Sequence, residues 1–191
     1  MKYPNGIKKQ NQNSFSHSNR GMNLEADLND TNEYYLTRDI AVIHKKPTPI
    51  TINKVNYKSR RDATITEAHF KTPSTTDYNG VYKGKYIDFE AKETKSLTSF
   101  PLSNIHPHQI KHLDSITRHG GIGFVIVRFI KLNKSYLLLY KDLADFIAKN
   151  SRVSIPISYF EKKGFIIKEA LSPRLDYLKI LDEEGVKIWK N

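Results

Sequence analysis

Cysteine is absent from this chain of 191 residues, and its absence limits the chemistry available to the protein. Without thiols the chain has neither a disulfide framework nor a thiolate metal site. Any bound metal must therefore be held by oxygen or imidazole ligands. Oxygen ligands suit hard cations such as Mg²⁺.

Long apolar runs are also missing. The longest are only long enough for a β-strand, whereas a membrane-spanning helix needs about 20 apolar residues. The N-terminal residues lack the apolar stretch of a secretory signal peptide. We therefore expect a cytoplasmic protein with no membrane partner.

Acidic residues are scarce beside basic ones, with 20 Asp and Glu against 31 Lys and Arg, so the formal net charge is +11. This surplus favours a polyanionic partner, and nucleic acid is a better candidate than an acidic membrane surface. Residues 1–20 contain no acid, and their few apolar side chains cannot offset the entropy of ordering. We expect a mobile basic arm there, either a tail that grasps DNA or a leader without a role.

A second segment without acidic residues runs from Lys45 to Arg61. Pro47 and Pro49 prevent a helix at its start, and its apolar residues are too few for a core element. We therefore expect residues 45–66 to project from the domain as a stalk, with an ordinary solvated loop as the alternative. The candidate DNA-binding residues are its six cations, Lys45, Lys46, Lys54, Lys58, Arg60 and Arg61.

Within residues 75–92, two strand-like runs meet at Lys83-Gly84, where glycine permits the positive φ of a tight turn. Antiparallel pairing across this turn places Asp77 opposite Glu90. Directly opposed like charges destabilise a sheet unless something cationic lies between them, so we expect a divalent metal there. The alternative is a polar strand pair that Lys92 bridges.

Other polar residues lie near this pair in the predicted fold. Asp88 shares a strand face with Glu90, as a further ligand or as a neighbour of the ligands. Glu25 lies on a predicted helix, where it either approaches the metal or is solvated. His106, His108 and His112 do not form a zinc motif, because no glutamate follows His108, so we expect them at the surface or on phosphate.

Predicted strands and helices alternate along the chain. Helices are predicted from Gly21 to Arg38, from Pro107 to His119, around Leu143 to Ile147, and after Pro173; strands are predicted at 40–43, on both sides of Lys83-Gly84, at 122–127, at 135–140 and at 164–167. Residues 64–70 fit a strand or a helix, and residues 94–103 are predicted to be a polar connection. The pattern predicts one α/β domain over residues 21–191, with a mixed central sheet flanked by helices.

Several segments resemble the RecU Holliday-junction resolvases, of the PD-(D/E)xK nuclease superfamily. The resemblance runs from about Asn19 to Asp182, and its most specific part is Ser74 to Lys95. Further matching segments are Asn19 to Met22, His44 to Ile50, Thr98 to Leu102 and Pro173 to Leu178.

The resemblance implies an activity and a set of site residues. It implies a Mg²⁺-dependent endonuclease, with one or two ions and Mn²⁺ as a substitute, that acts as a homodimer and places paired nicks in a four-way DNA junction. By this resemblance Thr75, Asp77, Glu90 and Gln109 bind metal, and Lys92 stabilises the transition state. It also implies that the stalk enters the junction and contributes to contact with the RecA recombinase, and that the protein acts at the nucleoid.

Two alternatives stay open at this point. The first is another PD-(D/E)xK nuclease, one that cuts plain duplex DNA. The second is a catalytically silent protein that binds junctions or modulates the recombinase, although the presence of Asp77, Glu90 and Lys92 argues against it.

Overall fold

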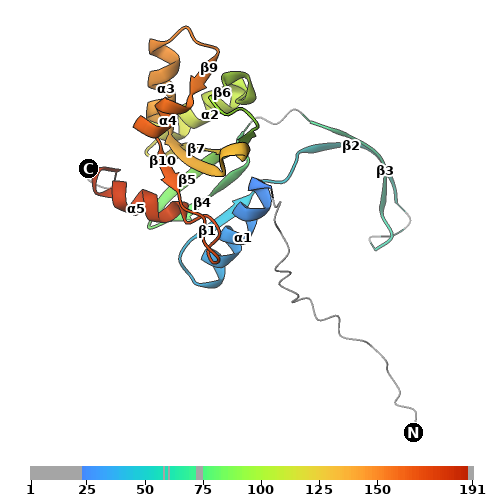
Figure 1. Ribbon diagram of the computed structural model, residues 1–191. Coiled ribbons are helices and arrows are strands. Elements are labelled where there is room, and N and C mark those ends of the chain that lie inside the picture. The colour runs from blue at the N-terminus through green and yellow to red at the C-terminus, as the bar shows by residue number, and fades with distance from the viewer. Residues whose placement is uncertain (1–22, 58, 60, 72–74, 189–191) are drawn as a thin grey trace.

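A mixed sheet of six strands forms the centre of the structure, a computed structural model that describes residues 23–57, 59, 61–71 and 75–188 (Figure 1). Its strands are, in spatial order, β1 (Val42–Lys45), β4 (Tyr78–Tyr82), β5 (Lys85–Thr94), β7 (Ile122–Phe129), β8 (Lys134–Leu139) and β10 (Phe165–Ile167). Strands β5 and β7 are parallel, and the other neighbouring pairs are antiparallel. The sequence prediction of a mixed sheet is confirmed.

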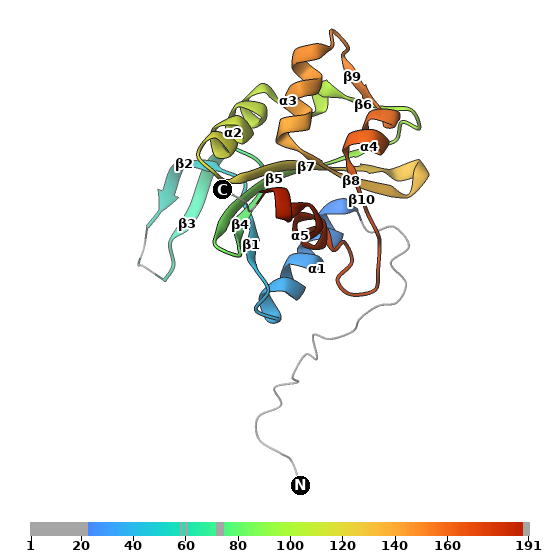
Figure 2. The ribbon, with the colours of Figure 1, turned by 90° about the vertical axis from the view of Figure 1, so that its left-hand side faces the viewer.

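Helices cover both faces of this sheet (Figure 2). One face carries α1 (Leu24–Thr37) and α5 (Tyr177–Ile188), and the other carries α2 (Pro107–Arg118), α3 (Tyr140–Lys149) and α4 (Ile157–Lys163). The sheet therefore has a hydrophobic core on each side, which explains why strand β7 is buried along its whole length. None of the described helices is long and apolar enough to cross a membrane.

The predicted β-hairpin is confirmed, with its register. Lys83 and Gly84 both have positive φ, 47° and 74°, as a tight two-residue hairpin turn requires. Tyr82 pairs with Lys85 and Tyr78 pairs with Phe89. Since register decides which face each side chain occupies, this pairing places Asp88 and Glu90 of β5 on the face of the sheet that α2 covers.

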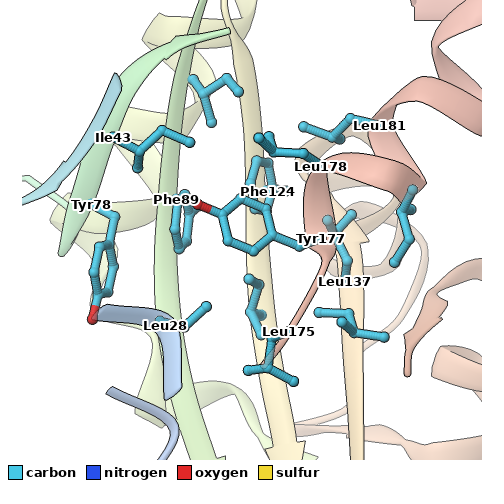
Figure 3. Close-up of a cluster of buried hydrophobic side chains, with 14 of the residues drawn as sticks. Leu28, Ile43, Tyr78, Phe89, Phe124, Leu137, Leu175, Tyr177, Leu178 and Leu181 are labelled. Atoms are coloured by element: carbon cyan, nitrogen blue, oxygen red, sulfur yellow. The ribbon is translucent and has the colours of Figure 1, made fainter. Parts of the chain in front are cut away.

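A stack of aromatic rings packs against β5 on the face of the sheet that α1 and α5 cover (Figure 3). The ring of Phe89 lies between Tyr78 and Phe124, with ring centroids 4.8 Å and 4.7 Å apart, and Tyr177 of α5 packs against it at 5.2 Å. Each aromatic pair contributes about 0.5–1.5 kcal/mol beyond the area that it buries. The stack therefore fixes the strand that carries the neighbouring carboxylates.

Between β1 and β4 the chain forms a separate two-stranded antiparallel sheet that extends away from the helices and the six-stranded sheet (Figure 1). Its strands are β2 (Ile50–Asn56) and β3 (Thr64–Phe70), and every residue in them is exposed. We call this pair the arm. The sequence left residues 64–70 open between strand and helix, and they form a strand that extends the projection to Phe70.

One prediction was wrong, and one helix begins later in the chain than predicted. Residues 94–103 are not only a polar connection, since β6 (Ser99–Pro101) pairs there with β9 (Ser154–Pro156) and buries Phe100 completely. Helix α5 begins only at Tyr177, because Leu175 forms a β-bridge with Glu169. Two short 3₁₀ turns complete the described elements, at Leu102–Asn104 and Ile130–Leu132.

Candidate active site

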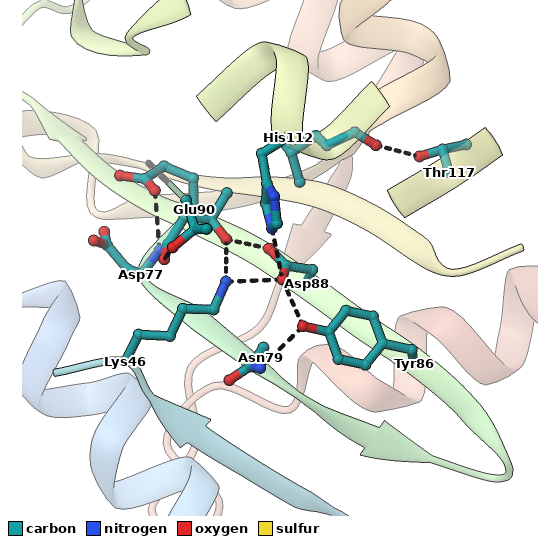
Figure 4. Close-up of polar contacts among 11 residues, drawn as sticks. Lys46, Asp77, Asn79, Tyr86, Asp88, Glu90, His112 and Thr117 are labelled. Atoms are coloured by element: carbon teal, nitrogen blue, oxygen red, sulfur yellow. Dashed lines mark hydrogen bonds and ion pairs between the residues drawn. The ribbon is translucent and has the colours of Figure 1, made fainter. Parts of the chain in front are cut away.

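Asp77 and Glu90 are neighbours in the structure. Asp77 immediately precedes β4, and its backbone N–H donates to Oε2 of Glu90 at 3.1 Å (Figure 4). The Glu90 side chain is completely buried, whereas Asp77 is half-buried. The residue before β4 and a residue of β5 therefore bring two carboxyl groups together at one point beside the sheet.

The environment of Glu90 disfavours its charged form. Burial, together with the hydrogen bond and the charge of Asp77, raises the pKa of the Glu90 carboxyl from 4.5 to about 7. Lys92, whose Nζ lies 2.6 Å from Oε1 of Glu90, opposes this shift. Two adjacent carboxyl groups with only one lysine between them form a site that a divalent cation would stabilise.

A cleft of about 220 Å³ opens beside the carboxylates. Asp77, Lys92 and Glu93 line it on one side, and the N-terminus of α1 lines the other. Glu93 also fixes this helix, because its Oε1 accepts a hydrogen bond from the Leu24 N–H at 2.7 Å. Glu25 lines the same cleft, where its carboxylate pairs with Lys45 at 2.5 Å.

Gln109 and Thr75 are the two neutral residues that the sequence suggested as metal ligands, and neither is among the residues that line the cleft. Gln109 is buried in the first turn of α2, and its Oε1 accepts a hydrogen bond from the His106 N–H at 2.9 Å. Thr75 is half-buried, two residues before Asp77. Within the described ranges, no three His, Asp or Glu side chains are grouped closely enough to hold a metal.

Asp88 makes a set of contacts in the structure that the amino-acid sequence did not predict. Its buried carboxylate contacts Lys46 Nζ at 2.8 Å and His112 Nε2 at 3.1 Å, and it accepts from Tyr86 OH at 3.0 Å (Figure 4). The hydroxyl of Thr76 donates to its other oxygen. The sequence indicated only that Asp88 shares a strand face with Glu90. It could not predict these contacts, because three of the four partners are distant from Asp88 in sequence.

The candidate DNA-binding cations have different environments. Lys54 and Arg61 are exposed on the arm and near its tip, whereas Lys58 and Arg60 lie outside the described residues. Lys45 is bound to Glu25 but stays partly exposed. Lys46 is mostly buried, and its charge is directed inward to Asp88.

The three histidines surround the first half of α2. His106 caps the helix, and its ring stacks on that of His108, with centroids 5.5 Å apart. His112 points toward Asp88 on the sheet (Figure 4). At least one of the three therefore has a partner inside the protein and not only at its surface.

The sequence matches a known family along most of its length. The family described as Recombination protein U matches residues 19–183. The Holliday junction resolvase RecU of Bacillus mycoides (strain KBAB4) is 51% identical, with 95% of this chain and 96% of that protein covered. The protein of the same name from Bacillus cereus (strain B4264) is 50% identical over the same shares.

One solved structure is also similar. Hjc, a Holliday junction resolvase from the archaeon Archaeoglobus fulgidus, matches 74% of this chain and 91% of its own. The TM-score is 0.42 and the sequence identity is 13%.

Proposed function

The chain belongs to the RecU family, and from this premise we propose that it is an enzyme that resolves four-way DNA junctions by cutting their phosphodiester backbone. Its relatives at 50% identity or more are named for this activity and match it over nearly their whole length. The observation that carries the proposal is the group of Asp77, Glu90 and Lys92 beside an open cleft. The net charge of +11 supports a nucleic-acid substrate.

The proposed cofactor is Mg²⁺, as one or two ions, with Mn²⁺ as a substitute. Asp77 and Glu90 would hold it, together with Thr75 and Gln109. When bound, such an ion lowers the pKa of a ligating water and neutralises charge on the scissile phosphate. Glu90 fits this role because burial beside Asp77 makes its charge unfavourable without a cation.

Lys92 is the proposed transition-state stabiliser. Its side chain is a quarter exposed and lines the cleft, and its Nζ is held 2.6 Å from Glu90 Oε1. That contact fixes Nζ beside the carboxylates, where it can donate to a phosphate oxygen as negative charge develops there. The desolvated position strengthens this interaction relative to the same contact in water.

The finer features of the reaction follow from the symmetry of the substrate. A four-way junction has two equivalent strands to cut, so a homodimer with one site per chain would place paired nicks.

The arm would enter the junction as a stalk, and RecA recombinase is a further proposed partner at the nucleoid. The proposed DNA contacts are Lys45, Lys54 and Arg61, with Lys46 near the site and Lys58 and Arg60 outside the described residues.

The domain assignment is part of the same proposal. Residues 21–191 would be a single nuclease domain, from which residues 45–66 project as the stalk. The basic N-terminal segment proposed for residues 1–20, which is distinct from the β2–β3 arm, lies outside the described residues.

A cleavage assay tests the proposal against its alternatives. Equal amounts of labelled junction, duplex and single-stranded DNA are incubated with the protein, with and without Mg²⁺. We expect paired nicks in the junction that require the metal. Preferential cutting of duplex would assign the chain to a different nuclease function, and binding without cleavage would make it a silent junction-binding protein.

A further inference from the structure

The carboxylate of Asp88 is a buried charge outside the proposed metal site. It is completely buried on β5, two residues before Glu90, and contacts four side chains. A buried charge is tolerated only when paired and hydrogen-bonded, and Asp88 meets this condition. The proposed reaction assigns it no chemical role.

Two of the four partners lie where the chain leaves the six-stranded sheet for the arm and where it returns. Lys46 follows the last residue of β1, where the chain leaves for the arm, and Thr76 stands just before Asp77, where it returns. The two are bonded to each other as well, with Lys46 Nζ 3.0 Å from Thr76 Oγ1. In addition, the Lys46 N–H donates to the carbonyl oxygen of Asp77 at 2.7 Å. The residues on either side of the arm, Lys46 before it and Thr76 after it, therefore converge on one carboxylate.

The other two partners belong to the body of the protein. His112 comes from the second turn of α2, and Tyr86 comes from β5 itself. Asn79 of β4 donates to the Tyr86 hydroxyl at 2.9 Å and so fixes its direction. The carboxylate is thus held by the sheet and by α2 while it holds the arm.

The arm has little else to define its direction. Every residue of β2 and β3 is exposed, so the two strands bury no face against the described helices or the six-stranded sheet. A two-stranded hairpin alone is only marginally stable in water. The orientation of the arm must therefore be set at its base, by the contacts around Lys46 and Thr76.

We propose that Asp88 is a positioning residue, which fixes the direction of the arm relative to the Asp77–Glu90 site through Lys46 and Thr76. Asp77 is bonded both to Lys46 and to Glu90, so the same contacts link the base of the arm to the carboxylates. For the proposed function, on which this second consequence rests, a fixed arm selects the branched shape that fits it. Asp88 therefore contributes to discrimination between junction and duplex.

The first test measures the direction of the arm without DNA. Because the chain has no cysteine, Thr64→Cys on β3 and Lys149→Cys on α3 place two spin labels at defined positions. Labelled chains are diluted into unlabelled ones, and the distance distribution is compared in otherwise wild-type protein, Asp88→Asn and Lys46→Gln. We expect a broader distribution in both variants. Lys46→Gln provides the test if Asp88→Asn does not fold.

Asp27→Asn is the matched control. Asp27 is equally buried, on α1, and it is paired with Arg128 at 2.6 Å and Arg174 at 3.2 Å on the opposite face of the sheet. Its replacement removes a buried charge whose ionic partners, Arg128 and Arg174, are not among the contacts of Asp88. An unchanged distribution in Asp88→Asn and Lys46→Gln, or equal broadening in Asp27→Asn, would overturn the proposal.

The second test measures selectivity by competition between junction and duplex DNA in EDTA, where no cleavage occurs. We expect the ratio of junction to duplex affinity to fall about tenfold in Asp88→Asn and to be unchanged in Asp27→Asn. A tenfold change lies in the range of measured coupling energies between contacting residues. A broader distribution with an unchanged ratio would refute the contribution to selectivity. If the wild-type protein itself showed no preference, the proposed function would fail, while the distance measurement would still decide the role of Asp88.

Discussion

At the scale of single residues, Glu90 contributes a pH dependence to the stability of the metal-free protein. Its folded-state pKa of about 7 exceeds the ordinary value of 4.5, so between these values the folded protein binds more protons than the unfolded chain. The contribution of Glu90 to the free energy of unfolding therefore decreases as pH rises through this window. A bound cation would remove this decrease by favouring the charged carboxylate.

We expect Glu90→Gln to abolish this pH dependence. In EDTA, the free energy of unfolding of the variant relative to wild type should rise by about 2–3 kcal/mol between pH 4 and pH 8. Urea unfolding at the two pH values measures it, with Glu183→Gln, an exposed carboxyl on α5, as the control. If the difference were the same at both pH values, Glu90 would not carry a raised pKa.

Asp77 separates cleavage from binding. We expect Asp77→Ala to eliminate cleavage in Mg²⁺, because one of the two proposed carboxylate ligands is removed, while junction affinity in EDTA stays within about threefold, since cations supply that affinity. Asp145→Ala, which removes an exposed carboxylate of α3, should leave both unchanged. Cleavage at the wild-type rate by Asp77→Ala would refute the site.

Lys92 is either a stabiliser of the transition state or a structural bridge to Glu90. We expect Lys92→Ala to slow single-turnover cleavage about 100-fold or more, with little change in junction affinity. Melting temperature is measured on the same sample in Mg²⁺. A normal rate in a protein that melts at a much lower temperature would favour the structural bridge.

At the scale of elements, local signals predicted what local interactions determine. The β4–β5 hairpin was predicted with its register, because Gly84 and the period-2 alternation of β5 are adjacent in sequence. Strands β6 and β9 were missed, because they are three residues long and pair across about 55 positions of sequence. The contacts of Asp88 were missed for the same reason, since Lys46 and His112 lie far from it in sequence.

The exposed cations of the arm give a prediction at this scale. Replacing Lys54 and Arg61 with alanine should weaken junction binding and reduce its salt dependence, by a slope of about 0.9 for each phosphate that is no longer neutralised. The measurement is the dissociation constant over a series of salt concentrations in EDTA. Alanine at Lys149 and Lys162, exposed on α3 and α4, is the control of equal charge. An unchanged slope of affinity against salt concentration would show that Lys54 and Arg61 are solvated and do not contact DNA phosphates.

At the scale of the whole molecule, the symmetry of the substrate predicts the behaviour of mixed dimers. When wild-type chains are mixed with an excess of Asp77→Ala chains, most wild-type chains should have an inactive partner. Such dimers have one functional site and should nick only one strand, so singly nicked junctions should accumulate in place of resolved duplexes. Gel separation of the two products measures this. A constant ratio of resolved to nicked product at every mixing ratio would contradict the dimeric mechanism.

The way in which the arm joins the sheet also bears on how the chain can diverge. Lys46 and Asp77 are hydrogen-bonded neighbours, and the Lys71 N–H similarly donates to the Pro49 carbonyl oxygen at 2.9 Å. Since β1 and β4 are already antiparallel partners, a short turn would connect them as well as the arm does. The arm is therefore an insertion between two strands of an otherwise complete sheet. Its length and sequence can change between lineages, or be exchanged by engineering, without rearranging the strands that carry the carboxylates.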